Sequence, residues 1–108
     1  MTILIAGTVD LAADKRQEVL ENAAELIAQT REQSGCRHYV WCADPTSDTT
    51  VYVYENWDST EELASHLAGP FYSKMLALLG SYGIENVEIS KFRIDHEEPV
   101  YDETGTPR

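Results

Sequence analysis

Glu55, Trp57 and His66 are the side chains in this sequence whose types and spacing best suit chemistry on a small molecule. A histidine can act as a general base near neutral pH, and a carboxylate can orient its ring. A tryptophan offers a flat surface for an aromatic ligand, together with an indole donor. We therefore predict that His66 is a catalytic base, that Glu55 orients it and that Trp57 stacks on the ligand. The alternative is that Glu55 and His66 form a structural contact and that Trp57 packs in the core.

The elements that carry these residues follow one another without a gap. Residues 51–57 alternate in the way a strand does, with Glu55 and Trp57 on the same face. Ser59 stands three residues before Glu62, which is the spacing of a capping box at a helix start. The helix that follows carries His66 at the border of its apolar side. The three candidates are thus predicted to share one pocket between sheet and helix.

The remaining sequence completes an alternating order of strands and helices. The expected elements are a strand at 2–9, a helix that starts with an Asp14–Gln17 capping box and ends at Gly35, a strand at 36–43, a second helix interrupted at Gly69-Pro70, and a strand at 84–94. This βαββαβ order predicts an α+β, ferredoxin-like fold with a four-stranded antiparallel sheet and two helices on one face.

The strands have apolar residues on both faces, whereas the helices can cover only one. A homodimer built sheet against sheet would cover the other face, and two-fold symmetry is its commonest form. We therefore expect one domain at 1–94 that pairs with a second copy.

The tail at 95–108 has five acids and one base, and Val100 and Tyr101 are its main apolar residues. We expect it to dock on the partner subunit.

The run E-N-W-D-S-T-E-E-L-A-S-H-L, with S-G-C-R-H-Y about twenty residues earlier, resembles the antibiotic biosynthesis monooxygenase domain, a family of small dimeric α+β barrels. The resemblance covers residues 2–94. Quinone-forming members oxidise phenols or anthrones with O2 and no cofactor, by deprotonating the substrate so that its carbanion or phenolate reduces oxygen. The resemblance therefore implies a small aromatic or phenolic ligand. Tyr39, Tyr72 and His38 are further candidates for substrate binding.

This sequence departs from the branches of that family at specific positions. Trp57 matches the pocket tryptophan of the quinone-forming branch, but the branch's Asn falls on Val53 and its Tyr on Leu63. The pocket tryptophan of the haem-degrading branch falls on His66, and its iron-ligating His falls near Met75, which argues against haem degradation. Two alternatives to a monooxygenase stay open: an isomerase that enolises a small ketone, and a non-catalytic dimeric module that binds a small ligand.

Composition narrows the partners further. Lys and Arg number 8 against 19 Asp and Glu, for a net charge of −11, which opposes nucleic acid and anionic membrane surfaces. No apolar run is long enough to span a membrane, and no signal peptide is evident, so we expect a cytoplasmic protein.

We expect no metal site and no cofactor, because the three histidines are widely spaced and nucleotide-binding motifs are missing. Cys36 and Cys42 lie too far apart along one strand for a disulfide and are predicted to be buried free thiols.

Overall fold

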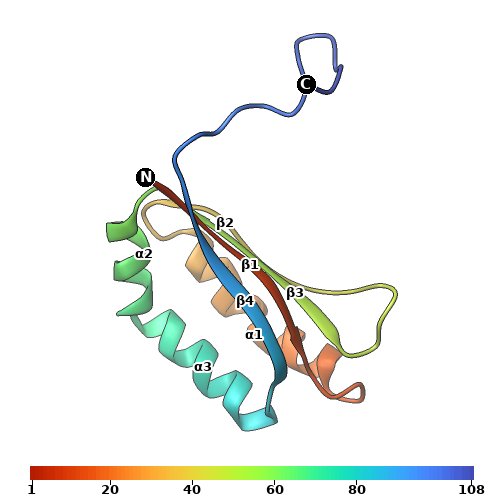
Figure 1. Ribbon diagram of the computed structural model, residues 1–108. Helices are drawn as coiled ribbons and strands as arrows, with labels where there is room; N and C mark the ends of the chain where they lie inside the picture. The colour runs from red at the N-terminus through yellow and green to blue at the C-terminus, as the bar shows by residue number, and fades with distance from the viewer.

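The four strands of the computed structural model, which describes residues 1–108, form one antiparallel sheet. The elements are β1 (Thr2–Asp10), α1 (Arg16–Arg31), β2 (Cys36–Ala43), β3 (Thr50–Trp57), α2 (Thr60–Leu67), α3 (Pro70–Tyr82) and β4 (Glu85–Ile94). The sheet order is β2-β3-β1-β4, and all three helices cover the same face of it (Figure 1). The predicted ferredoxin-like α+β fold is confirmed. We call the helix-covered side the inner face and the other side the outer face.

The second predicted helix is divided in two at the expected place. Gly69, in an extended conformation, precedes α3, and Pro70 is the first residue of that helix. A proline fits there because its missing N–H would have no intrahelical partner in the first turn. The break gives the structure three helices where the sequence predicted two, and it lets α2 and α3 run along different parts of the sheet.

The two predicted capping boxes had different outcomes. The Ser59 side chain accepts a hydrogen bond of 3.2 Å from the Glu62 N–H, as predicted. The box at Asp14 is wrong: α1 begins at Arg16, and its N-terminal cap is Lys15, without a side-chain bond. The Arg16 guanidinium donates to the carbonyl of Ser47, in the loop between β2 and β3, and to that of Thr50, the first residue of β3. The start of α1 is therefore tied to that loop by a tertiary contact.

Helix α1 also ends earlier than predicted. Its last residue is Arg31, and Gly35 lies beyond it in the turn that opens β2, with a positive φ of 80°. A side chain at Gly35 would collide with that of Glu62 on α2, because a Cβ there would lie 2.5 Å from its nearest atoms. Glycine is therefore needed at this position for the turn and for close packing against α2.

The inner face carries the hydrophobic core and confirms the predicted alternation of β3. Val51, Val53, Glu55 and Trp57 are each buried, with at most 8% of their surface exposed. On the neighbouring strands, Glu55 is paired with Ile5 of β1 and Tyr39 of β2. Apolar side chains from the helices complete the core above the sheet, and they are Val19, Ala23, Ile27, Leu63, Met75 and Leu79.

The outer face carries several apolar side chains, and no helix covers it. Tyr52 is 50% exposed and Phe92 is 48% exposed. The strand registers place further apolar side chains beside them, and these are Leu4, Ala6, Val40, Tyr54 and Ile94.

The two cysteines are free, as predicted, but they are not both buried. Cys36 is half-buried, and Cys42 is exposed. The prediction of a buried Cys42 is wrong because this residue pairs with Tyr52 and thus points to the outer face, which no helix covers.

Residues 95–108 form an arm that leaves the end of β4; Glu97 near its base pairs with Arg37 of β2, and its far end stands away from the domain (Figure 1). The Cα radius of gyration is 15.3 Å, against about 13 Å for a compact chain of this length. The projecting arm accounts for the larger radius of gyration. None of the helices is both long and apolar enough to cross a membrane.

Candidate functional site

A cavity of about 300 Å³ lies between the inner face of the sheet and helices α2 and α3. Thirteen of its fourteen lining residues are hydrophobic, and Glu55 is the only charged one. The lining side chains are Ile5, Val9, Tyr39, Trp41, Val53, Glu55, Leu67, Tyr72, Met75, Leu76, Leu79, Ile84, Val87 and Ile89. Several residues at its rim are well exposed, among them Leu67, Leu76 and Val87. This cavity suits an apolar ligand with one or two polar groups.

Glu55 is placed in the cavity by the alternation of β3. Its Oε1 accepts a hydrogen bond of 3.0 Å from the indole Nε1 of Trp57, and no other hydrogen bond reaches the carboxylate. Burial raises the pKa of Glu55 above its ordinary value, and the Trp57 bond opposes that rise. A carboxylate with a raised pKa in an apolar cavity is suited to taking a proton from a bound molecule.

Tyr39 faces Glu55 across the β2–β3 register and lines the same cavity. It is 2% exposed, and its hydroxyl forms no hydrogen bond in the structure. Burial raises the pKa of the Tyr39 phenol well above its ordinary value, and the Glu55 charge adds to that effect. Tyr39 therefore remains a neutral donor at physiological pH. The structure thus places this candidate in the lining of the cavity.

Trp41 also lines the cavity, and the sequence analysis did not single it out. Its indole N–H is buried and has no hydrogen-bond partner. It lies near enough to the Tyr39 hydroxyl to lower the pKa of that phenol, although the geometry between the two groups falls short of a hydrogen bond. The signal was present in the sequence, since Tyr39 and Trp41 are two residues apart and so share one face of the strand.

Trp57 lies two residues beyond Glu55 on the same face of β3 and does not line the cavity. The side chain is completely buried, with no exposed surface, so its ring has no free face for a ligand. One edge donates to Glu55, and the ring stacks on His66 with 4.7 Å between the centroids. The geometry favours a supporting role for Trp57 over the predicted stacking on a ligand.

His66 is enclosed by aromatic rings and does not line the cavity. It is 2% exposed, and it contacts Trp57, Tyr39 and Tyr72. Its Nδ1 lies 2.7 Å from Oε1 of Gln33, a residue that the sequence analysis did not identify. Burial lowers the pKa of His66, so the ring is neutral near pH 7. The expected direct bond between Glu55 and His66 is absent, because Trp57 lies between them.

The two weaker candidates lie on different sides of the sheet. Tyr72 lines the cavity and meets His66 edge to face at 5.8 Å between centroids. His38 is exposed and lies near Tyr54, with 5.6 Å between their rings. Because His38 neighbours the outward-facing Asn56 and Tyr54, it is on the outer face and cannot line the cavity.

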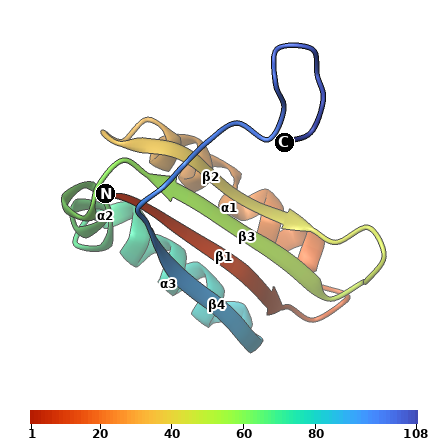
Figure 2. The ribbon, with the colours of Figure 1, turned by 45° about the horizontal axis from the view of Figure 1, so that its top comes forward.

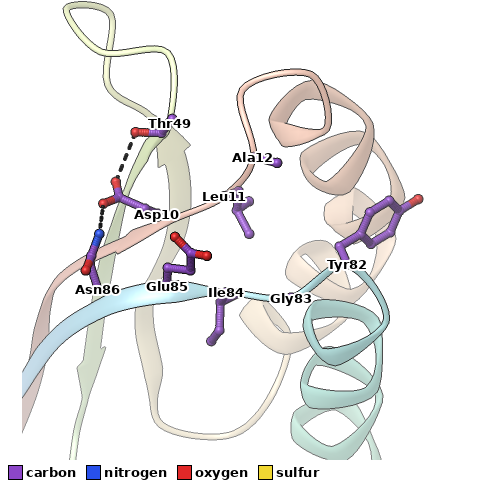
Figure 3. A pocket seen from close by; sticks show the side chains of 9 residues that line it. All are labelled: Asp10, Leu11, Ala12, Thr49, Tyr82, Gly83, Ile84, Glu85 and Asn86. Atoms are coloured by element: carbon purple, nitrogen blue, oxygen red, sulfur yellow. Dashed lines mark hydrogen bonds between the residues drawn. The ribbon is translucent and has the colours of Figure 1, made fainter.

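A second hollow of about 370 Å³ lies at the far end of β1, around Asp10 (Figure 3). Asp10 accepts hydrogen bonds from Asn86, Thr49 and Thr50, which link β1 to the start of β4 and to the β2–β3 loop. The Tyr82 hydroxyl donates to Glu18 on α1, away from Asp10 (Figure 3). The polar groups here hold loops together. We find no arrangement of three or more His, Cys, Asp or Glu side chains suited to a metal ion.

A sequence profile described as "Antibiotic biosynthesis monooxygenase" (ABM) matches residues 2–78. The match runs from β1 through most of α3. It includes all the residues that line the cavity around Glu55 except Leu79, Ile84, Val87 and Ile89. The chain belongs to the ABM family. The match confirms the resemblance seen in the motif around Trp57. It establishes the family, while the reaction and substrate of this member lie beyond it.

Solved structures agree with the fold of this ABM chain. A candidate antibiotic biosynthesis monooxygenase from Deinococcus radiodurans superposes with a TM-score of 0.80 at 19% identity, covering 94% of this chain and all of that one. A similarly described protein from Caulobacter crescentus gives a TM-score of 0.74 at 19% identity, covering 90% and 91% of the two chains. At these identities the similarity shows the fold alone.

One curated relative of this ABM chain is an uncharacterized protein, sll1783, from Synechocystis. It is 24% identical over 92 residues, which are 85% of this chain and 63% of the relative. The matched residues thus make up less than two thirds of that protein's length.

Proposed function

We propose that this ABM chain is a cofactor-independent monooxygenase that oxidises a hydroxylated aromatic with O2 and forms a quinone. The observation that carries the proposal is the cavity, in which Glu55 is the one charged group among thirteen hydrophobic residues. Such a cavity fits a flat, largely apolar molecule, and it offers a base where the surroundings exclude most water. Membership in the ABM family supports the same class of reaction.

In this proposal Glu55 accepts the proton that the substrate must lose. For an anthrone, the ring carbon that carries two hydrogens loses one as a proton, and the resulting carbanion reduces O2. The overall change converts that CH2 group and O2 into a carbonyl group and water. The unpaired hydroxyl of Tyr39, opposite Glu55, is positioned to donate to the oxygen that becomes negative as the proton leaves.

The geometry changes the roles predicted for His66 and Glu55. His66 was predicted to be the base, but Glu55 lines the cavity and His66 does not. We propose that His66 is a positioning residue. By stacking on the ring of Trp57, it holds that ring in the orientation in which the Trp57 N–H donates to Glu55. Gln33 fixes His66 in turn through Nδ1.

Oxygen-electrode traces on a panel of anthrones and dihydroquinones test the reaction. We expect O2 uptake with quinone formation, and a fall of about 10²- to 10⁴-fold in turnover for Glu55→Gln. Hydrogen–deuterium exchange into a ketone without O2 uptake would instead identify an enolising isomerase at the same site. Thermal stabilisation by ligand without either reaction would identify a binding module.

We also propose that the protein is a homodimer joined through the outer face. The apolar residues there, with Tyr52 and Phe92 about half exposed, lie on all four strands, and exposed patches of this kind commonly mark interfaces. A two-fold dimer would place this surface against its own copy. Light scattering at micromolar concentration should give about twice the 12.1 kDa chain mass, and Tyr52→Asp should reduce it toward the monomer.

A further inference from the structure

The C-terminal arm has a structured end that touches nothing in its own domain. Residues 100–108 close on themselves: the Arg108 N–H donates to the Val100 carbonyl at 2.8 Å, and the Asp102 N–H donates to the Thr106 carbonyl at 2.9 Å. The Asp102 carboxylate accepts three more bonds, from Thr104 and Thr106. We call residues 100–108 the arm loop. Its shape is fixed by its own hydrogen bonds.

The arm loop exposes its only large apolar side chains. Val100 is 62% exposed and Tyr101 is 59% exposed, and every residue from 95 to 108 is in the exposed class. Preformed backbone with an unburied aromatic side chain is a common arrangement for a docking element, because little conformational entropy remains to be lost on binding.

The base of the arm fixes the direction in which it projects. Arg37 of β2 pairs with Glu97 of the arm at 3.2 Å and with Asp58 after β3 at 2.5 Å. The arm therefore crosses the outer face from β4 toward β2, as Figure 2 shows, and the arm loop lies beyond that crossing. A groove of about 450 Å³ remains between the arm base and outer-face residues such as Leu4 and Tyr54. The arm thus emerges on the side of the sheet where a second copy is proposed.

We propose that the arm loop is a clasp that docks on a second copy of this chain, with Val100 and Tyr101 as its apolar anchors. This inference rests on the homodimer proposed above and goes beyond it, because each copy would hold the other by an arm. Symmetry then gives two arm contacts for each dimer.

The charge of the arm favours a second copy as its partner. Residues 95–108 carry five acids and one base, a net charge of −4. Most of this chain is acidic as well, but Lys91 and Arg93 are exposed on the edge strand β4 and form no ion pair. Their side chains lie on the inner-face side of that edge strand, so an acidic arm that wraps around the edge of the second copy's β4 would pair with them, and such pairing would also guide the association.

Equilibrium sedimentation of the full-length protein and of a Val100→Ala, Tyr101→Ala double variant tests the clasp. We expect the dimer dissociation constant of the double variant to rise by about 10- to 1,000-fold, because two pairs of anchors are lost from each dimer. Glu103→Asp, in the same loop, keeps the charge of the arm and has no apolar contact surface, so it is the matched control and should change the dissociation constant little. Circular dichroism confirms that each variant is folded.

The outcomes separate the clasp from the dimer and from the reaction. Equal dissociation constants for the wild type and the double variant would overturn the clasp and leave the sheet-to-sheet dimer standing. A monomeric wild type would overturn both, without bearing on O2 uptake. As a second measurement, a photo-crosslinking amino acid at position 101 should give a covalent dimer on irradiation, and crosslinks confined to single chains would also overturn the clasp.

Discussion

The indole Nε1 of Trp57 donates a hydrogen bond of 3.0 Å to Oε1 of Glu55, two residues earlier on β3. The two side chains are neighbours because alternate residues of a strand lie on one face. The other side of the indole stacks on His66. Trp57 thus connects the carboxylate in the cavity to the histidine behind it, and it is the residue through which His66 can influence Glu55.

Replacing Trp57 with Phe should raise the pKa of Glu55 further. The phenyl ring can still stack on His66, but the donor that stabilises the ionised carboxylate is lost. Loss of this hydrogen bond should also lower the free energy of unfolding by about 1–3 kcal/mol. NMR titration of the Glu55 carboxyl carbon measures the pKa. Trp41→Phe is the control, because the Trp41 N–H has no partner to lose. An unchanged pKa in Trp57→Phe would show that the bond does not control Glu55.

Glu55→Gln should change how stability depends on pH. Burial raises the Glu55 pKa in the folded protein above its ordinary value of 4.5, so the folded state binds this proton more tightly than the unfolded state does. The stability that comes from the protonated group is fully present below pH 4.5 and is lost as pH rises through the folded pKa. Relative to Glu55→Gln, the wild type should therefore lose stability as pH rises. Urea unfolding from pH 4 to 8 checks this, and parallel curves for the two proteins would contradict it.

His66→Ala should lower the free energy of unfolding substantially. The position predicted from the sequence, at the border of the apolar side of the helix, implied instead that truncation would be tolerated. The ring is 2% exposed and sits among Trp57, Tyr39 and Tyr72, so truncation leaves a cavity. We expect a loss of about 2–4 kcal/mol, a drop in Tm of roughly 10 °C or more. The turnover rate per folded molecule should fall less than in Glu55→Gln. A rate loss in His66→Ala that exceeds that of Glu55→Gln would restore His66 as the base.

Protonation of His66 should destabilise the protein in acid. Burial lowers its folded pKa below 6.5, so its contribution to stability is present above pH 6.5 and is lost as pH falls through the folded pKa. In urea unfolding, this loss should be reduced in His66→Asn, which has no imidazole to protonate. An equal acid loss in both proteins would assign it to other groups.

Features of the fold that depend on neighbouring residues along the chain could be predicted from the sequence. The alternation at 51–57, the Ser59 cap and the break at Gly69-Pro70 each follow from local chemistry, and the structure confirms them. The Asp14 cap failed because Arg16 bonds to carbonyls some thirty residues away, and that contact decides where α1 begins. Local sequence patterns do not predict tertiary contacts of this kind.

The candidate site was predicted less completely, for the same reason. Spacing placed Glu55 and Trp57 on one face, but their mutual hydrogen bond was not anticipated, although their two-residue separation on a strand allows it. Gln33 meets His66 across 33 positions of sequence, and no motif indicates that pair. Which side of an aromatic cluster faces a cavity depends on how the helices pack on the sheet, and this packing is known only from the structure.

An aromatic ligand in the cavity should quench tryptophan fluorescence through Trp41. The chain has two tryptophans, and only Trp41 lines the cavity, whereas Trp57 is fully buried and does not line it. Titration with a phenol or anthrone should therefore reduce the emission, and Trp41→Phe should lose most of the response. Ile89→Phe, which places a ring in the cavity, should weaken binding. A full response in Trp41→Phe would place the ligand elsewhere.

Gly7→Ala should separate β1 from β4 and destabilise the fold. A Cβ at Gly7 would lie 1.9 Å from the Glu88 carbonyl oxygen and 2.6 Å from the Ile89 Cα, and backbone atoms in a paired strand cannot move aside easily. We expect a loss of about 1–3 kcal/mol in urea unfolding. Ligand affinity should fall as well, because Ile89 lines the cavity. Gly80→Ala is the control: its Cβ would meet no atom within 4 Å, and the position lies inside α3, so alanine should stabilise by about 0.5–1 kcal/mol. If Gly7→Ala matched the wild type in stability, the close approach of β1 and β4 at Gly7 would not limit this position.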